Sequence, residues 1–361
     1  MSARLSDRPW LAGSALAGIW QRGAGMTMLL SQASHAYSVI LAVLAARDRP
    51  RPEIWVPAYF CEGALLVARR AGARLRFVPV TEAMTPVWPE VEAMTADSVP
   101  DLLVLPHFFG AESDGALARA FCDRIGCLLH EDAAHLLQPV GTVGTWGDFV
   151  SFSPRKYCGI ADGGVLVVRG AKLAAEAEQA ATRLAAVPQD TRRERFLLWR
   201  NGLPWMARRG PQPAVAFDVD PYGASSLPSV WISAPSSRRL HRLGPTGLDR
   251  IAAREAVTAA AIERALRPLG LEPLPRLAGA TPYILGFRAP SQATAARAHD
   301  ALRRAGAIAG SWPRLPPEVL AAPQHFGAAE ALRQSVVRIS TRYEERRRPL
   351  DFVAALEAAA S

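Results

Sequence analysis

The stretch from about residue 30 to residue 170 alternates short apolar runs with helical patterns, which restricts the fold more than any other feature. The apolar runs lie at 54–56, 75–80, 102–105 and 127–129, and helical segments lie at 33–46, 62–71 and 117–125. Gly72 and Gly126 follow two of these helices, where a left-handed C-cap is favoured. Strands that are apolar on both faces predict an α/β sheet, mixed but mostly parallel, with helices on both sides. The runs at 149–152 and 165–168 have little between them, so we expect them to pair directly.

The remainder of the chain predicts a second, smaller unit. Helical patterns cover 172–200 and 238–266, and a connection rich in Pro, Gly and Ser separates them at 202–229. Strands at 283–287 and 336–340, with helices at 292–305 and 349–359, predict an α+β domain. We therefore expect an N-terminal segment (1–30), with a helix in 10–20, that packs on the core, a large α/β domain (31–240) and a small C-terminal α+β domain (241–361).

Composition argues against several classes of partner. The net charge is +9, but the arginines lie in short scattered groups and no nucleic-acid-binding module surrounds them, so no nucleic-acid partner is predicted. No apolar stretch reaches membrane-spanning length without charges, so no membrane partner is predicted. The four cysteines form no CxxC pair and no secreted framework, which favours a reducing, cytoplasmic setting.

Lysine is scarce in this chain. Only two of the 42 basic residues are lysines, Lys156 and Lys172, and all the others are arginine. A guanidinium stays protonated and forms no imine with an aldehyde, whereas a lysine amine can react. A lysine kept in an arginine-rich background is therefore a candidate for carbonyl chemistry. Lys172 begins an amphipathic helical pattern and is expected at the surface, which leaves Lys156.

Three polar segments follow predicted strands: His-Glu-Asp-Ala-Ala-His at 130–135, Ser-Phe-Ser-Pro-Arg-Lys at 151–156 and Asp-Gly-Gly at 162–164. Ligand sites of α/β sheets gather at the carboxyl ends of strands. Together the segments match what pyridoxal 5'-phosphate requires. Lys156 holds the aldehyde as a Schiff base, Asp132 faces the ring nitrogen, and His135 lies near the phenolic oxygen. The helix start at 31–34 and the hydroxyl of Ser151 are suited to the phosphate.

The order HEDAAH, GDFVSFSPRK and DGG, with VPAYFC and PHFFG upstream, resembles the DegT/DnrJ/EryC1/StrS aminotransferases, of which the chain is identified as a divergent member. The resemblance covers about 28–170 and implies a fold-type I enzyme that uses pyridoxal phosphate and belongs with makers of amino sugars on nucleotide carriers. It implies the same roles for Lys156, Asp132, His135 and Ser151. The phosphate-binding helix start then falls at Ala33 and Ser34, a histidine of the family falls at His107, and the family's sites at subunit interfaces imply a homodimer.

Departures from the family lie on the substrate side. The aromatic residue that stacks on the cofactor falls at Cys61, so Tyr59 or Phe60 beside it is expected to replace it. The family's Glu-Gly-Gly is Asp-Gly-Gly at 162–164. Its Gly-Tyr-Asn-Tyr-Arg loop, which reaches the neighbouring subunit, has no clear counterpart, and 229–233 lies near its place.

The expected function is therefore transamination, from an amino-acid donor such as glutamate to a carbonyl acceptor such as a keto sugar, free or nucleotide-linked. Two alternatives remain open: a non-transaminating pyridoxal-phosphate enzyme, namely a dehydratase or an enzyme that tailors an amino acid, and a non-catalytic binding or regulatory protein. No metal site is predicted, because His130, Asp132 and His135 lack His-Glu-x-x-His spacing and no Cys/His cluster follows. Individually, Asp132 also suits a helix N-cap, and His107, Tyr59 and Phe60 also suit core positions.

Overall fold

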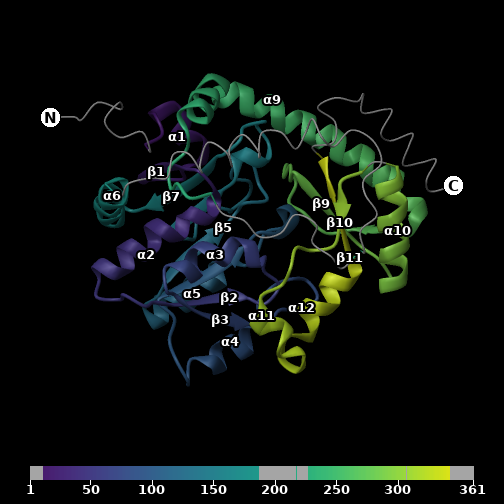
Figure 1. Ribbon diagram of the computed structural model, residues 1–361, viewed down its shortest axis with the longest axis horizontal. Coiled ribbons are helices and arrows are strands. Elements are labelled where there is room, and N and C mark those ends of the chain that lie inside the picture. The colour runs from purple at the N-terminus through teal and green to yellow at the C-terminus, as the bar shows by residue number, and fades with distance from the viewer. Residues whose placement is uncertain (1–10, 187–216, 218–226, 306, 342–361) are drawn as a thin grey trace.

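The computed structural model describes residues 11–186, 217, 227–305 and 307–341. Within this part the chain forms a seven-stranded sheet and a four-stranded sheet. The helix α9 (Ala234–Leu266) runs along the top of Figure 1 from the large sheet to the small one. The predicted helix at 349–359 and most of the connection at 202–229 lie outside the described residues.

The large sheet has the strand order β1-β7-β6-β5-β4-β2-β3. Its strands are β1 (Gly25–Leu30), β2 (Glu53–Pro57), β3 (Arg74–Val78), β4 (Leu102–Pro106), β5 (Leu128–Asp132), β6 (Phe149–Phe152) and β7 (Gly164–Arg169). β7 runs antiparallel to both of its neighbours, and the other pairs are parallel. The predicted mostly parallel sheet and the direct pairing of the last two runs are confirmed.

Helices cover both faces of this sheet, because its strands alternate two apolar sets. Ile54 and Val56 pack in the cluster that holds α2 (Ala36–Ala46), α3 (Glu62–Arg70) and α6 (Ala171–Ala185). Trp55 between them packs in the cluster that holds α4 (Trp88–Met94) and α5 (Gly115–Ile125). Gly126 ends α5 with φ 77°, as its C-cap position predicts.

The N-terminal segment both packs on the sheet and extends it. The helix α1 (Ser14–Trp20) buries Leu16 and Trp20, and the Trp20 indole donates to the carbonyl of Leu137 at 2.8 Å. The segment expected to pack on the core thus contains a helix with two buried residues. β1 was not expected within 1–30. It pairs with β7 in continuous register from Gly25↔Arg169 to Leu30↔Gly164 and forms one edge of the sheet.

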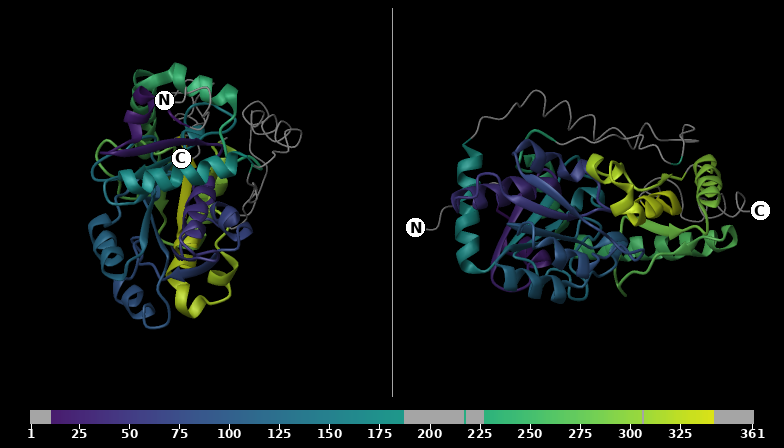
Figure 2. Two further views of the ribbon diagram at one scale, coloured as in Figure 1. Left: turned by 90° about the vertical axis from the view of Figure 1, so that its left-hand side faces the viewer. Right: turned by 90° about the horizontal axis from the view of Figure 1, so that it is seen from below.

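The small sheet is antiparallel, with the order β10-β11-β9-β8. Its elements are β8 (Glu272–Pro273), β9 (Ile284–Arg288), α10 (Gln292–Arg304), β10 (Ala309–Gly310), α11 (Pro317–Leu320), α12 (Pro323–Ser335) and β11 (Val336–Ser340). These elements lie at one end of the long axis in the right-hand view of Figure 2. The predicted domain boundary at 240/241 falls inside α9, a few residues before the kink at Gly244, where φ is 55° and ψ is −170°.

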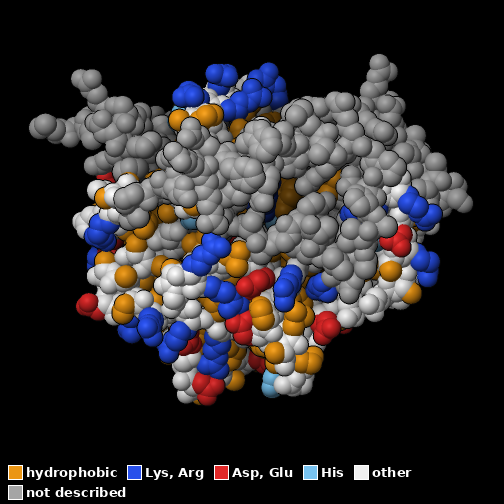
Figure 3. Space-filling view, in the orientation of Figure 1, with side chains coloured by type: hydrophobic (Ala, Val, Ile, Leu, Met, Phe, Trp, Pro, Cys, Tyr) orange, Lys and Arg blue, Asp and Glu red, His pale blue; other side chains and the backbone are white. Residues whose placement is uncertain are grey.

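The surface carries its positive charge mostly as separate side chains. Figure 3 shows Lys and Arg spread over the described surface, with a group at the top, where α9 lies. Arg238, Arg239 and Arg242 of α9 are exposed there. Among the helices of the described residues, none has the length and apolarity needed to cross a membrane.

Candidate active site

The site forms where β5 and β6 end side by side. Parallel register places Asp132, the last residue of β5, opposite Ser151 of β6. A one-turn 3-10 helix, η4 (Pro154–Lys156), follows β6 and brings the Lys156 side chain back toward the end of β5. Its amine Nζ donates to the carbonyl of Ala134 at 3.4 Å. The structure therefore brings Lys156, Asp132 and Ser151 to the same edge of the sheet.

The Asp132 carboxylate is held from two sides. Its Oδ1 accepts the Ala134 N–H at 3.0 Å and lies 3.4 Å from the Ser151 hydroxyl. The same hydroxyl lies 3.0 Å from Nε2 of His130. Burial lowers the pKa of His130, against the opposing effect of the Asp132 and Glu131 charges. The neutral ring donates from Nε2 to Ser151, and the Ser151 O–H points to Asp132.

This arrangement differs from the expected role of Ser151 at the phosphate. Its hydroxyl already joins His130 to Asp132, so its binding to phosphate stays a prediction. Ser153, two residues on, was interpreted from the sequence as a turn residue. Its hydroxyl is buried and has no hydrogen-bond partner among the described residues, which leaves it available for a ligand.

His135 is a neutral hydrogen-bond donor toward the site. Its Nδ1 accepts the N–H of Phe109 at 3.0 Å, so the proton of the neutral ring sits on Nε2. Burial, with added repulsion from Lys156 and Arg338, lowers the pKa of His135 well below its ordinary value. Phe109 has φ 54°, a left-handed conformation that costs a bulky residue about 1–3 kcal/mol. This strained backbone directs the N–H that holds the His135 ring.

Aromatic rings surround His135 and Lys156. The ring centroids of Phe109, Tyr283 and Trp312 lie 5.5–5.6 Å from that of His135. The Lys156 amine lies over the Tyr283 ring, 4.6 Å from its centroid. Tyr283 precedes β9 and Trp312 follows β10, so the small-sheet side supplies this wall. Sequence reasoning did not single out either residue, because neither lies in a motif.

Tyr59 and Phe60, the expected replacements for a stacking residue, both lie in the core. Tyr59 stacks on Trp312 with the centroids 4.6 Å apart, so one of its faces is covered. Phe60 is 3% exposed and packs in the cluster with α2 and α3. Stacking of either ring on a cofactor stays a prediction, and Trp312 and Tyr283 are the rings beside His135 and Lys156.

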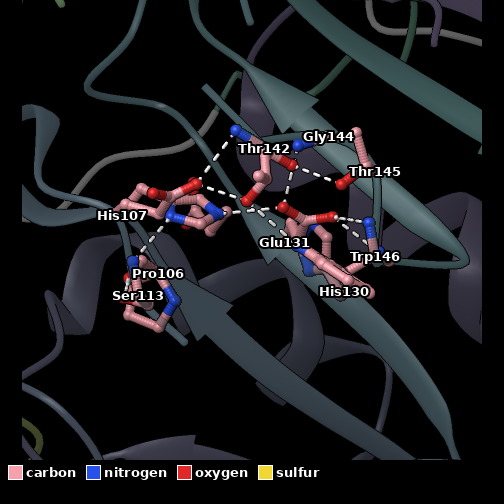
Figure 4. Close-up of polar contacts among 12 residues, drawn as sticks. Pro106, His107, Ser113, His130, Glu131, Thr142, Gly144, Thr145 and Trp146 are labelled. Carbon is pink, nitrogen blue, oxygen red and sulfur yellow. Dashed lines mark hydrogen bonds and ion pairs between the residues drawn. The ribbon is translucent and has the colours of Figure 1, made fainter. Parts of the chain in front are cut away.

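A buried hydrogen-bond network centred on the Glu131 carboxylate holds the end of β5 in place (Figure 4). The Glu131 carboxylate accepts N–H groups from Gly144 and Trp146 at 2.8 Å and from Gly147 at 2.5 Å. It also accepts Nε2–H of His107 at 3.0 Å, while Nδ1 of His107 accepts the N–H of Ser113 at 3.2 Å. Burial alone would raise the pKa of Glu131, but these hydrogen bonds lower it below its ordinary value.

His107 was expected to bind the cofactor. Both of its ring nitrogens have protein partners, so it has no free nitrogen for direct contact in this arrangement. In the structure His107 holds the carboxylate of Glu131, the residue before Asp132 in β5. A direct contact with the cofactor stays a prediction that the geometry does not favour.

Ala33 and Ser34 begin η2 (Ala33–His35), the 3-10 turn that leads directly into α2. The first N–H groups of a helix have no partner within it and favour an anion. Gly164 at the start of β7 lies against this turn: a Cβ there would be 2.4 Å from the Ala33 nitrogen. Glycine is therefore required for this close approach, which accounts for the second glycine of the Asp-Gly-Gly motif.

Residues 227–233 line the same turn from the other side. The Ser31 N–H donates to Val230 O at 2.9 Å, and the Leu227 N–H donates to the side chain of Gln32 at 3.0 Å. Buried Asp162 accepts the N–H and the hydroxyl of Ser233 at 2.6 and 2.7 Å. The segment near the expected place of the subunit-bridging loop is thus bound to its own chain.

Taken together, these residues fit pyridoxal phosphate: an amine for the aldehyde, a carboxylate at the neighbouring strand end and, for the phosphate, the helix start at Ala33 and the separate hydroxyl of Ser153 after β6. Residues 22–195 match the model of the DegT/DnrJ/EryC1/StrS aminotransferase family. The match covers just under half of the chain, which over these residues is similar to this family. Its members use pyridoxal phosphate, and the protein is a pyridoxal-phosphate-dependent aminotransferase by class.

Solved structures show the same fold. A crystal structure of 3-amino-5-hydroxybenzoic acid synthase is 19% identical, with a TM-score of 0.64 over 96% of this chain and 88% of that one. A putative sugar aminotransferase from Streptococcus pneumoniae in its PMP form is 15% identical, with a TM-score of 0.66 over 99% and 93%. PseC of Helicobacter pylori, an aminotransferase of pseudoaminic acid biosynthesis, is 11% identical, with 0.66 over 97% and 92%. The comparison with curated protein sequences found no match.

Proposed function

We propose that this protein transfers an amino group from an amino-acid donor such as glutamate to the carbonyl group of a keto sugar, free or nucleotide-linked. The observation that supports this most is the Lys156 amine on the Ala134 carbonyl, two residues beyond the Asp132 carboxylate. The structural relatives named above include a putative sugar aminotransferase and an enzyme of pseudoaminic acid biosynthesis, which favours a sugar acceptor.

When bound, pyridoxal phosphate supplies an aldehyde that takes up the amino group and a ring that accepts the electrons released at the donor's α-carbon. Lys156 would hold the aldehyde of the cofactor, and its Nζ would carry the proton that the donor's α-carbon loses. Asp132 would supply the negative charge that keeps the ring nitrogen protonated, and Nε2–H of His135 would donate to the phenolic oxygen.

The environment of Lys156 favours these steps. The rings of Phe109, Tyr283 and Trp312 lie around His135 and place apolar surface beside the site. Low water content strengthens the interaction between each charge and its partner. The Glu131 network keeps the end of β5 rigid, which holds Asp132 at a constant position.

Chemical trapping tests the cofactor bond directly, because the chain has only two lysines. We expect the protein to show visible absorbance with pyridoxal phosphate and, after borohydride reduction and peptide mapping, to carry the label on Lys156. Lys156→Ala should lose both signals, and the matched variant Lys172→Ala should keep both. A label on Lys172, or no label, would contradict the proposal.

Reaction with glutamate tests the transfer itself. We expect glutamate to convert the wild-type cofactor to its stable aminated form, with release of 2-oxoglutarate in equal amount. A keto sugar should then restore the original spectrum. Spectral change without keto acid would instead favour a non-transaminating enzyme, and absence of cofactor absorbance would favour a non-catalytic protein.

A homodimer and a reducing cytoplasmic setting belong to the same proposal. The family resemblance supports the dimer, and all four cysteines are free thiols. Light scattering after size-exclusion chromatography tests the first, and we expect twice the chain mass of 38.9 kDa. A mass equal to one chain at micromolar concentration would contradict it.

A further inference from the structure

A chain of hydrogen bonds between three side chains ends at Asp132. His130 and Asp132 lie two residues apart in β5, so their side chains point to the same face of the sheet. Parallel register places Ser151 of β6 beside Asp132 on that face. Nε2 of His130 lies 3.0 Å from the Ser151 hydroxyl, which lies 3.4 Å from Oδ1 of Asp132. The strand geometry therefore connects His130 to Asp132 through Ser151.

His130 occupies a position where an apolar side chain would pack at lower cost. Its partners in register on the neighbouring strands are Val104 and Phe149, both apolar and fully buried. The His130 ring is 1% exposed and packs edge-on against Tyr37, with the centroids 5.5 Å apart. Burial of a polar ring costs free energy unless the ring forms hydrogen bonds. Among the described residues, Ser151 is the one hydrogen-bond partner of this ring, so the reason for a histidine here lies at Ser151.

The direction of these hydrogen bonds follows from the other ring nitrogen. Nδ1 of His130 is buried and has no partner in the described part of the chain. If Nε2 accepted the Ser151 proton, the N–H of the neutral ring would sit on Nδ1 without an acceptor, and Asp132 would lose a donor. If Nε2–H donates to Ser151, the Ser151 O–H donates to a carboxylate, which is the stronger kind of hydrogen bond. His130 is therefore the donor, and Ser151 donates in turn to Asp132.

The donors on Asp132 converge on one of its two oxygens. Oδ1 accepts the Ala134 N–H at 3.0 Å as well as the Ser151 hydroxyl at 3.4 Å. Two donors on one oxygen, one from each side of the strand end, oppose rotation of the carboxylate. The other oxygen, Oδ2, thus keeps a constant direction in which it can meet a ligand.

We propose that His130 is a positioning residue that acts through the Ser151 hydroxyl to hold Asp132 in the orientation that meets the ring nitrogen of the cofactor. This inference rests on the role proposed for Asp132 and adds the residue that orients it. Without His130, the Ser151 hydroxyl is free to turn to another acceptor. Asp132 then loses one of its two constraints, although no group in contact with the cofactor has been removed.

Two forms of the cofactor that differ at one ring atom test this. Deazapyridoxal 5'-phosphate has a C–H group in place of the ring nitrogen and keeps the aldehyde and the phosphate. The full chain, freed of cofactor, is titrated with each form by calorimetry, which gives two dissociation constants. Contacts with the aldehyde and the phosphate cancel in the ratio of these constants, so the ratio reports the interaction between Asp132 and the ring nitrogen.

We expect the wild type to prefer the form with the ring nitrogen, and Asp132→Asn to lose that preference. His130→Leu and Ser151→Ala should each reduce the preference about fivefold, which corresponds to one neutral hydrogen bond. The double variant should reduce it no further than either single variant, because both substitutions break the same chain of hydrogen bonds. His130→Gln keeps an N–H donor at a similar reach and should restore most of the preference.

The matched control is another buried histidine. His299 of α10 is 2% exposed, and His299→Leu should leave the preference at the wild-type value. A histidine that only stabilises the fold affects both forms of the cofactor equally. An unchanged ratio in His130→Leu would therefore overturn the inference, even if both dissociation constants rose.

The outcomes separate this inference from the proposed function. If Asp132→Asn abolishes the preference and His130→Leu keeps it, the inference fails alone. If the wild type shows no preference, Asp132 does not meet the ring nitrogen, and its proposed role fails together with the inference. No amino donor is present in the titration, so a failure of transamination would leave the ratio standing. Circular dichroism identifies a variant that lost its fold, and Ser151→Ala then decides.

Discussion

The two walls of the site differ in origin. The strand-end wall, made of Asp132, His135, Ser151 and Lys156, comes from one continuous stretch at the ends of β5 and β6. The small-sheet wall, made of Tyr283, Trp312 and Arg338, comes from three separate segments. The first wall holds the groups to which we assign the chemistry, and we expect the second to contact the substrate. On this proposal the chemistry comes from one short stretch, while selectivity depends on how the small sheet packs.

The largest expected effect is on the strand-end wall. Lys156→Ala should lower the rate of amino transfer by about 10⁴-fold, because it removes both the covalent holder and the proton carrier. The free energy of unfolding should change little, because the amine makes one long hydrogen bond. Steady-state kinetics and urea denaturation measure the two quantities, with Lys172→Ala as control. Activity above about 1% of wild type would show that this wall is not the reactive one.

Two adjacent residues of β5 are expected to differ in role: Asp132 affects the reaction rate and Glu131 affects stability. Asp132→Asn should lower the rate about 10²- to 10³-fold, as the loss of one preorganised charge does elsewhere, and leave stability within about 1 kcal/mol. Glu131→Gln should instead cost about 3 kcal/mol of unfolding free energy, because its buried carboxylate accepts three N–H groups and His107. Equal effects of both changes on stability would contradict this division.

The same division explains what the sequence could predict. The mostly parallel sheet and the segment of 130–156 followed from apolar strands, the lysine count and local spacing. β1 was missed because Gly25–Leu30 becomes a strand only by pairing with β7, far along the chain. Trp312 and Arg338 lie in no local sequence motif. Arg338 stands out only from the alternation of side chains along β11 and from the glycines opposite it on both neighbouring strands. The choice of Ser151 as a site residue followed from spacing, but its hydrogen bond to His130 is apparent only in the structure.

On the small-sheet wall, Trp312→Phe should raise KM for the acceptor about fivefold and change kcat less. The indole contacts Tyr59, Phe109 and His135, and its buried Nε1 has no partner in the part of the chain that the structure describes. A substrate hydroxyl is therefore the group expected to accept its N–H. Loss of one such hydrogen bond corresponds to about 1 kcal/mol. Trp88→Phe, at a ring packed on Phe121 away from the site, is the control. A fall in kcat with unchanged KM would instead show that Trp312 acts in the reaction step and not in binding of the acceptor.

The smallest expected effect is on the pH dependence of stability and concerns His135. Its ring is acted on by the charge of Lys156 in the strand-end wall and by that of Arg338 in the small-sheet wall. Burial and these two charges lower its folded pKa well below the unfolded value of about 6.5. Below pH 6.5 the unfolded chain therefore binds a proton that the folded chain does not, so stability is highest above that pH and falls as pH decreases.

His135→Gln should reduce the stability lost between pH 8 and pH 5.5 by about 1 kcal/mol, measured by urea denaturation. The exposed His241→Gln should leave that loss unchanged. Arg338→Gln should reduce it by less than His135→Gln does, since burial and Lys156 remain. An unchanged loss in His135→Gln would mean that the ring is protonated in the folded protein, and that it cannot be the neutral donor that both walls require.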